Sequence, residues 1–346
     1  DDVQGSGHVR SFVQCQPILK RCAGSMRAMT PSPASVSPRD SSLGPSTKRW
    51  HIGVLWAGVP LCVLGLLHYR LWEQWPSGRF GELLLLSLLA WGASWVLRRF
   101  AGWSWASAQA LVWSTALLVF AGVVPTAATA LLGVAALALG GWVARSEHPA
   151  LQAACGLVML GATLGWLLPL PMHTRWLYLG MCVVLLVLRR EALAASFKQA
   201  REGWRIAVAS APRPAALAVL AMGLASTGAW LPTLQVDDLG YHLRLPWMLL
   251  QEARYAPDPE THVWALAPWL GDVLQAVPHI MGGAEARGPL NALWMLITAA
   301  GVWQLANALG GGARARWASV ALYASIPLTA ALAGSMQTEA PTTALL

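Results

Sequence analysis

The residues best suited to chemistry stand in the last third of the chain, beside segments apolar enough to cross a bilayer. Asp237 and Asp238 directly follow one such segment, and Tyr241, His242 and Glu339 come after them. A carboxylate at a membrane boundary loses hydration, so it needs a partner or a task. One such task is general-base catalysis, in which the carboxylate takes a proton from a hydroxyl group. We therefore expect the function to reside on the side of the membrane where these residues emerge.

The adjacent pair Asp237 and Asp238 has two interpretations. Both side chains cannot point at one atom, so one would be catalytic and the other structural or metal-binding. Alternatively, the pair caps a helix that begins near Leu239, because aspartate is a favoured N-cap residue and helix N-termini attract anions. The local sequence leaves both interpretations open.

Composition indicates a helical membrane protein. The 346 residues are 56% hydrophobic and 12% charged, against about 25% charged in soluble domains. The 20 tryptophans exceed the five tyrosines and five phenylalanines, as expected where indole rings favour the membrane interface. Several apolar runs reach about 20 residues, which excludes a soluble protein with a large core. The net charge of +8 does not indicate a nucleic-acid partner, because the basic residues flank apolar segments.

Apolar runs separated by charged residues, proline or glycine predict an all-α fold, a polytopic membrane protein with about nine to ten transmembrane helices. Six spans come first, at residues 50–69, 82–97, 105–124, 126–143, 151–169 and 175–188. After a polar connector, further spans are expected at residues 215–231, 289–309 and 315–333, and a tenth begins at residue 340.

These runs divide the chain into four parts. Residues 1–49 are rich in serine and proline, which predicts a disordered tail or sequence translated upstream of the true start. Residues 50–190 are expected to form a six-span membrane module, and residues 191–214 a cytoplasmic connector. Residues 215–346 are expected to be the start of a catalytic core, truncated at its C-terminus because the chain stops at Leu346 inside an apolar run.

Basic residues at the span ends predict the orientation. One side of the membrane receives Lys48, Arg49, Arg98, Arg99, Arg145, the connector, Arg314 and Arg316, whereas the other receives Arg70, Arg79 and Arg175. By the positive-inside rule, the richer side is cytoplasmic. We therefore expect a multi-pass protein of the cytoplasmic (inner) membrane with a cytoplasmic N-terminus and a periplasmic active site around Asp237 and Glu339.

The outer loop at residues 232–288 is too long to lack structure in a compact protein. Apolar residues recur at helical spacing from Leu239 to Leu250, and a second apolar stretch covers residues 263–281. We expect two interfacial helices that lie along the membrane surface. Interfacial helices that cover a cavity in the membrane suit a lipid substrate.

The stretch VDDLGYHLRLPWMLLQEARYAPDP resembles the first outer loop of GT-C-type glycosyltransferases, membrane enzymes that use polyprenyl-phosphate sugars. Protein O-mannosyltransferases and the aminoarabinose transferases of lipid A belong to this superfamily. It carries an acidic pair after the first core span and an aromatic residue four positions beyond the first acid, as Asp237, Asp238 and Tyr241 do. Three later stretches resemble the family in the expected order: APWLGDVLQ at 267–275, GGAEARGPLNALW at 282–294 and SMQTEAPTTALL at 335–346. The resemblance covers residues 215–346.

This resemblance implies a glycosyltransferase that moves a hexosyl or pentosyl group from a polyprenyl-phosphate carrier to an acceptor, which is a glycolipid, a glycan or a protein. Displacement at the anomeric carbon would invert its configuration. Asp237 would be the catalytic base, although Asp238 stays an alternative, and Glu339 would line the same cavity. The leaving phosphate needs a cation, for which Arg244 and Arg254 are the local candidates, or a divalent metal. Neither arginine is assigned with certainty, because arginines also anchor loops to headgroups.

The histidines of the outer loop are less informative. His242 would bind the phosphate or the acceptor together with Tyr241, or it would only hold the loop by hydrogen bonds. His262 and His279 lack the spacing of metal ligands. We therefore assign no metal-ligating residues and no certain cofactor.

Two features depart from the family pattern: Glu339 stands where many relatives carry aspartate, and six spans precede the first core span. Two other functions are therefore weighed. A transporter or lipid flippase would carry charges near the middle of its spans, whereas the acids here lie at span ends and in the outer loop. A non-catalytic membrane scaffold predicts that removal of Asp237 leaves function intact.

Overall fold

The computed structural model describes residues 77–144, 148–233, 235–260, 263–266 and 270–345, together with scattered positions between 57 and 70. The chain divides into two compact units, Asp1–Trp75 and Pro76–Leu346, and every element discussed below belongs to the second. The predictions for residues 1–49 and for most of the first span lie outside the described residues.

The described part of the second unit is helical and contains no strand, which confirms the predicted all-α class. Seven helices precede the outer loop: α3 (Ser77–Ala101), α4 (Trp105–Phe120), α5 (Val123–Val143), α6 (Pro149–Leu167), α7 (Arg175–Leu188), α8 (Arg190–Ser210) and α9 (Pro212–Ser226). The short 3-10 helix η2 (Thr227–Ala229), the π-helical turn η3 (Asp238–His242), α10 (Arg244–Glu252), η4 (Val263–Leu266) and α11 (Leu270–Gly282) follow. The last elements are α12 (Arg287–Ala308), α13 (Ala313–Ser325), α14 (Pro327–Ala333) and α15 (Glu339–Leu345).

Fewer helices qualify as membrane spans than the nine to ten that the sequence predicts. Among the described residues, Gly78–Ala101, α5 and α6 are long and apolar enough to cross a bilayer, and α8 with α9 would add a fourth span that is bent by 116°. The span expected at 315–333 is divided between α13 and α14. The break falls at Ile326 because Pro327, which lacks an N–H group, begins a new helix.

The polar connector expected at 191–214 forms the regular helix α8. It ends at Ser210, and Pro212 occupies the first position of α9, where the missing N–H group of a proline costs nothing. The indole Nε1 of Trp204 on α8 donates a hydrogen bond of 3.0 Å to the Ser107 hydroxyl on α4. The connector helix α8 therefore packs against α4 as part of the bundle.

Glycines bring α5 and α6 into direct backbone contact. A Cβ atom at Gly140 would lie 1.8 Å from the carbonyl oxygen of Gln152, and one at Gly156 would lie 1.8 Å from that of Ala136. Small residues at a helix interface allow such close approach, which is typical of membrane helices because dispersion contacts replace the hydrophobic effect there. Leu132, Leu157 and the neighbouring alanines complete a buried apolar core around this pair.

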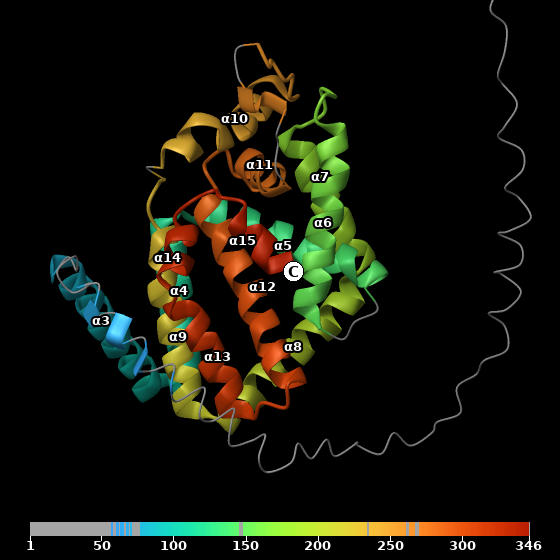
Figure 1. Cartoon of the computed structure of the whole chain (residues 1–346). Coiled ribbons are helices and arrows are strands. Elements are labelled where there is room, and N and C mark those ends of the chain that lie inside the picture. Colours follow the sequence, from blue (N-terminus) through green and yellow to red (C-terminus); the bar gives the residue numbers. More distant parts are fainter. Residues whose placement is uncertain are drawn as a thin grey trace, which may run out of the picture. The chain divides into compact units, whose positions relative to one another are not determined.

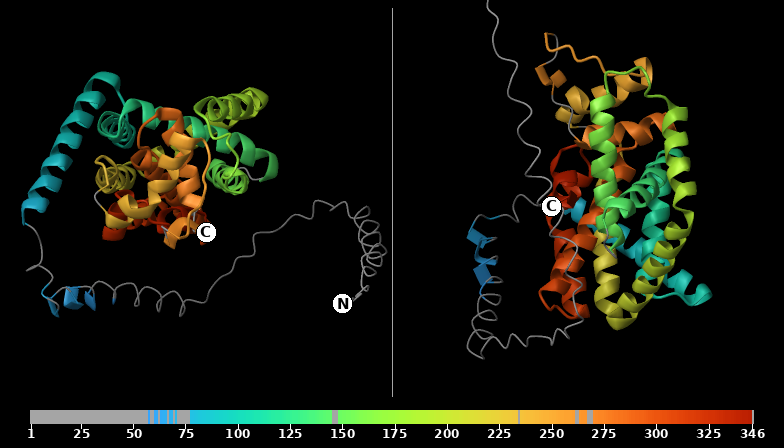
Figure 2. Two further views of the ribbon diagram at one scale, coloured as in Figure 1. Left: turned by 90° about the horizontal axis from the view of Figure 1, so that it is seen from above. Right: turned by 90° about the vertical axis from the view of Figure 1, so that its right-hand side faces the viewer.

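The segments of the outer loop gather at one end of the bundle, near the top of Figure 1 and of the right-hand view of Figure 2. They are held by the turn between α6 and α7. The His173 N–H group donates to the Ala253 carbonyl at 2.9 Å, and the Tyr255 N–H group donates to the Leu168 carbonyl at 2.8 Å. The predicted pair of helices in this loop therefore corresponds to α10 and α11.

Candidate functional site

The turn that carries the acidic pair is the π-helical turn η3, which begins after Asp237. Asp237 has helical backbone angles, and its side chain makes no capping hydrogen bond, so the interpretation of this residue as a side-chain N-cap is wrong. Asp238 and His242, four residues apart, are buried at 0% and 2% exposure, whereas Asp237 is exposed and Tyr241 half-buried. Residues spaced by four share a helical face, so one face of the turn holds it in place and the other is free for a substrate.

Asp238 joins two loops that are distant in the sequence. Its Oδ2 accepts a hydrogen bond of 2.5 Å from the Thr233 hydroxyl, and its Oδ1 accepts one of 2.9 Å from the Met336 N–H group. Met336 lies three residues before Glu339 at the start of α15. A buried carboxylate needs such partners because it has lost its water, and these partners bring the Asp237 turn and the Glu339 turn together.

His242 fixes the same turn to α11. Its Nδ1 lies 2.8 Å from Oδ1 and 3.0 Å from Oδ2 of Asp272, and both side chains are buried. A carboxylate on one ring nitrogen sets the tautomer and leaves the other nitrogen, Nε2, to act toward a ligand. The hydrogen-bonding role that the sequence analysis kept open for His242 is therefore present.

Tyr241 marks the point on which the carboxylates converge. Burial and then the negative charges of Asp237, Asp272, Asp238 and Glu339 raise the pKa of the Tyr241 phenol above its usual range. The hydrogen bond from the Met336 N–H group to Asp238 also places the start of α15, which carries Glu339, beside the turn that carries Asp237 and Tyr241. The Tyr241 ring stacks on Trp264 with centroids 5.5 Å apart.

A buried arginine and asparagine on α12 hold the two loops from below. The Arg287 guanidinium donates to the carbonyl oxygens of Leu231 and Ala333, and its Nε lies 2.8 Å from Oε1 of Glu285. One turn along the helix, the Asn291 side-chain NH₂ group lies within hydrogen-bond distance of the carbonyl oxygens of Leu332, Ala333 and Ser335. Asp238, Arg287 and Asn291, which we call the loop clamp, thus connect residues 231–238 to residues 332–336.

Close backbone packing tightens the same region. A Cβ atom at Gly288 would lie 2.0 Å from the Ala229 carbonyl oxygen, and one at Gly228 would lie 2.4 Å from that of Ala330. Only glycine permits these approaches without a shift of the backbone. The clamp therefore acts on segments that already touch.

The two arginines proposed for the leaving group differ in position. Arg244 stands at the start of α10, two residues after His242, whose ring contacts Asp272. Burial raises the pKa of Tyr255, and the charge of Arg244 opposes this shift. Arg254 is exposed, with its Nε 3.9 Å from Oε2 of Glu252, and no contact in the described residues connects it to the carboxylates.

The described residues contain no group of three or more histidine, cysteine, aspartate or glutamate side chains arranged to hold a metal ion. No step of the reaction proposed below is assigned to a metal ion. A cavity of about 570 Å³ lies elsewhere, among α4, α8, α9, α12 and α13. The candidate site is defined by its carboxylates and by Tyr241.

Sequence reasoning missed Asp272, Arg287, Asn291 and Thr233, the partners that position the predicted residues. Asp272 interrupts an apolar stretch, and Arg287 and Asn291 are spaced by four at the start of an apolar helix. Polar residues on one face of an apolar segment indicate buried partners, so this signal was available. Which carbonyl groups they bind depends on chain segments 40 or more residues away.

Comparison with protein-family models, with curated proteins and with solved structures gave no match to this chain.

Proposed function

We propose that this chain is a membrane glycosyltransferase that moves a sugar from a polyprenyl-phosphate carrier to an acceptor hydroxyl on the periplasmic side. The observation that carries the proposal is the convergence of Asp237, Glu339 and Tyr241 at one end of a bundle that includes apolar helices long enough to cross a membrane. The order of motifs in the sequence supports the same assignment.

Asp237 is the general base in this proposal, and Asp238 is not. Asp237 is exposed and has no hydrogen bond with another described side chain, whereas both oxygens of Asp238 are engaged. A base must reach the proton that it abstracts. Accessibility therefore supports Asp237 rather than Asp238 as the base in this proposal.

The proposed reaction is a single displacement. The acceptor oxygen forms a bond to the anomeric carbon while its proton passes to Asp237, and the bond from that carbon to the phosphate oxygen breaks. Polyprenyl phosphate leaves with the electron pair and is stabilised by Arg244. The Tyr241 phenol, protonated at neutral pH as an ordinary tyrosine is, donates a hydrogen bond to the sugar or the acceptor.

The test uses the protein in membranes supplied with labelled polyprenyl-phosphate sugars. We expect Asp237→Asn to lower sugar transfer by about a hundredfold or more, the scale of a lost general base. Glu260→Gln, which neutralises an exposed acid of the same outer loop, serves as the matched control and should transfer sugar at the wild-type rate.

Equal transfer by wild type and Asp237→Asn would show that Asp237 is not the base. Absence of transfer from every donor, with folded protein in the membrane, would contradict the glycosyltransferase proposal. A transporter or a scaffold would then be the better hypothesis.

A further inference from the structure

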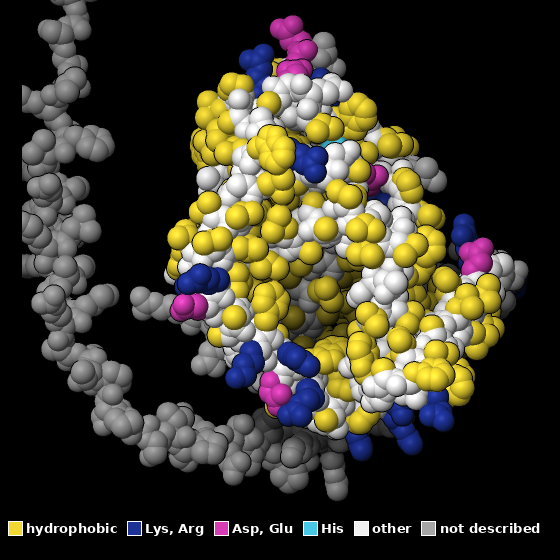
Figure 3. All heavy atoms as spheres, turned by 180° about the vertical axis from the view of Figure 1, so that it is seen from behind, with side chains coloured by type: hydrophobic (Ala, Val, Ile, Leu, Met, Phe, Trp, Pro, Cys, Tyr) yellow, Lys and Arg dark blue, Asp and Glu magenta, His cyan; other side chains and the backbone are white. Residues whose placement is uncertain are grey.

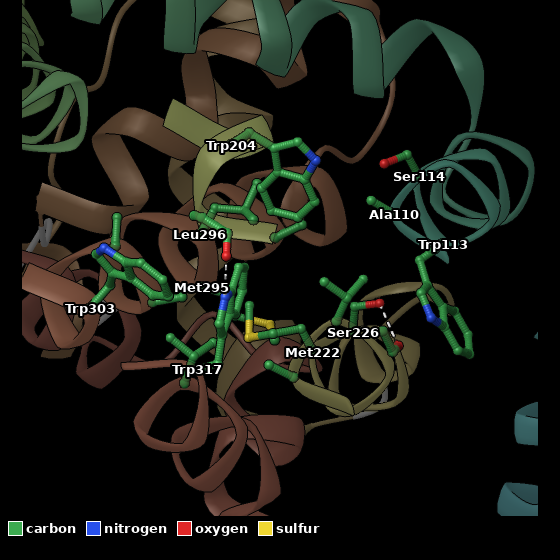
Figure 4. A pocket seen from close by; sticks show the side chains of 18 of the residues that line it. Ala110, Trp113, Ser114, Trp204, Met222, Ser226, Met295, Leu296, Trp303 and Trp317 are labelled. Atoms are coloured by element: carbon green, nitrogen blue, oxygen red, sulfur yellow. Dashed lines mark hydrogen bonds between the residues drawn. The ribbon is translucent and has the colours of Figure 1, made fainter. Parts of the chain in front are cut away.

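The bundle encloses an apolar cavity that the proposed reaction does not use. Its volume is about 570 Å³, within the range of about 300–1,000 Å³ for small-molecule sites. Alanine, leucine, methionine and tryptophan side chains of α4, α8, α9, α12 and α13 make up most of the wall, and Figure 4 shows Met222, Met295, Leu296 and several indole rings around the space. No aspartate, glutamate, lysine or arginine lines it.

The cavity is elongated along the helices. On α12 its lining extends from Ala292 to Gln304, which corresponds to about 18 Å at 1.5 Å per residue. One residue beyond its outer end lies Asn291, and one turn further lies Arg287. Both are buried and hydrogen-bonded in the loop clamp. This polar layer separates the cavity from the carboxylate cluster.

The other end of the cavity is aromatic and carries an arginine with an unsatisfied atom. Trp317 packs edge-to-face against Trp204 and Trp303, with centroids 5.8 Å and 4.7 Å apart. The Arg316 guanidinium lies 5.2 Å from the Trp303 ring centroid. Its Nε is buried and has no hydrogen-bond partner. Its stacking partner Trp303 and its chain neighbour Trp317 both line the cavity, so the half-buried guanidinium of Arg316 lies beside this end, where it can donate to an anion.

Positive charge gathers around this end. Lys198 and Arg201 are exposed on α8 beside the cavity-lining residue Ala200, and Arg314 is exposed on α13. Figure 3 shows a recess among hydrophobic side chains on the face opposite to that of Figure 1, with Lys and Arg side chains near its lower edge. Arg201, Arg314 and Arg316 belong to the side that the positive-inside rule assigns to the cytoplasm.

We propose that this cavity binds an acyl chain of an anionic glycerophospholipid whose phosphate is held by Arg316. The apolar wall suits a hydrocarbon chain, and the unpartnered arginine beside its aromatic end suits a phosphate, because charge-assisted hydrogen bonds to guanidinium are among the strongest. The inference does not depend on the glycosyltransferase proposal.

The sugar donor of that proposal is a poorer occupant. Its phosphate must lie beside Asp237, and a chain from there would have to cross the buried layer of Asn291 and Arg287 to enter the cavity. A phospholipid of the leaflet beside Arg316 meets no such barrier. Helices α4 and α8 do not contribute to the carboxylate site. Lipid binding in the cavity gives them a function.

The experiment titrates the full chain in neutral detergent with phosphatidylglycerol whose acyl chains are brominated, because bromine quenches indole fluorescence on contact. Brominated phosphatidylcholine measures quenching of tryptophans on the outer surface. We expect the anionic lipid to quench more, with a saturable excess that reports the four cavity tryptophans, Trp113, Trp204, Trp303 and Trp317.

Two variants test the two parts of the lipid, each with a matched control. Arg316→Gln should weaken binding of the anionic lipid by about tenfold, on the scale of one charge-assisted hydrogen bond, whereas Arg175→Gln, at an exposed arginine that begins α7, should not. Gly203→Leu should abolish the excess quenching, because Gly203 lines the cavity and a Cβ atom there meets no neighbour within 4 Å. Gly180→Leu on α7, also with open space at its Cβ, should leave the excess intact.

Three outcomes would overturn the proposal. Equal quenching by the two lipids would mean that the headgroup is not recognised. Excess quenching that survives in Gly203→Leu would place the chain outside the cavity. Displacement of the brominated lipid by polyprenyl phosphate at about a tenfold lower concentration than by unlabelled phosphatidylglycerol would identify a different occupant.

Discussion

Two arginines show how differently the two polar regions of this bundle are built. Arg287 is 2% exposed and bound to two carbonyl groups and to Glu285. Arg316 is half-buried, stacks on Trp303, and has a buried Nε without a partner. The first guanidinium is hydrogen-bonded within the fold, whereas the Nε of the second has no hydrogen-bond partner among the described residues.

We assign the buried polar groups of the loop clamp to support of the fold, and Arg316 to recognition of a ligand. Around the loop clamp, internal hydrogen bonds occupy the buried polar groups, and the groups left accessible are Asp237, Glu339 and the Tyr241 phenol. Around the cavity, the walls are apolar and the single buried unsatisfied guanidinium atom lies at one end. The bundle therefore presents accessible carboxylates at one place and an apolar cavity at another.

The largest expected effect is a loss of stability when Arg287 is replaced. Arg287→Met leaves Glu285 and two buried carbonyl groups unpaired, so we expect a loss of about 3–5 kcal/mol in unfolding free energy. Arg316→Gln should change it by less than about 1–2 kcal/mol, the scale of a cation–π contact. Thermal unfolding in detergent measures both, and equal losses would show that the two arginines have the same structural role.

A smaller effect separates the neighbouring aspartates. Asp238→Asn turns one acceptor into a donor that faces Thr233 or the Met336 N–H group, which costs about 1–3 kcal/mol of stability. Asp237→Asn is an exposed substitution and should stay within about 0.5 kcal/mol. Unfolding in a graded denaturant measures the difference. A reversed order of stability would contradict the assignment of Asp238 to support.

Acid should destabilise the outer end through His279 on α11. Burial lowers the pKa of His279, which the charge of Glu285 offsets in part, and its Nδ1 is buried without a partner. The unfolded chain then binds a proton more readily than the folded one, so stability falls as the pH drops below about 6.5. We expect His279→Phe to reduce the difference in melting temperature between about pH 8 and about pH 5.5.

The control for this pH effect is His148→Gln, which removes an exposed histidine at the start of α6. It should leave the wild-type pH dependence in place. If His279→Phe and wild type lose the same stability in acid, the effect arises from another group.

The smallest expected effect is spectroscopic. The Tyr241 pKa is raised by burial and by its four acidic neighbours, so Asp237→Asn and Glu339→Gln should each lower it because a negative charge is removed. Ultraviolet absorbance of the phenolate follows the titration, and Tyr241→Phe identifies the signal. Glu260→Gln should not shift it. An unchanged pKa in both variants would show that Asp237 and Glu339 do not share a site.

Several elements of the fold were predictable because they depend on local composition. The runs at 105–124, 126–143 and 151–169 correspond to α4, α5 and α6 within a few residues, since apolar residues without breaks form helices regardless of their neighbours. The points at which helices end were less predictable. Pro327 divides an apparent span, and the polar connector becomes α8, because capping and tertiary contacts decide where a helix ends.

The candidate site divides in the same way. The Asp237 and Tyr241 pair and Glu339 could be selected from the sequence because charged and aromatic groups beside apolar spans are unusual. The separate roles of Asp237 and Asp238 could not be predicted from the sequence, because the two residues have the same side chain and differ only in their surroundings. Asp272 and Arg287 were passed over because their partners lie on distant segments.

The sequence by itself determined the helical class, the compatibility of several helices with a membrane, and the residues from which a carboxylate site could be built. These follow from side-chain polarity and spacing, which are properties of the chain. Only the tertiary structure decided that Asp238 is buried and Asp237 is accessible, that Arg287 joins two loops, and that a tryptophan-lined cavity ends at Arg316. Those facts depend on which segments meet, and burial and hydrogen bonding are set by the meeting of segments rather than by either one alone.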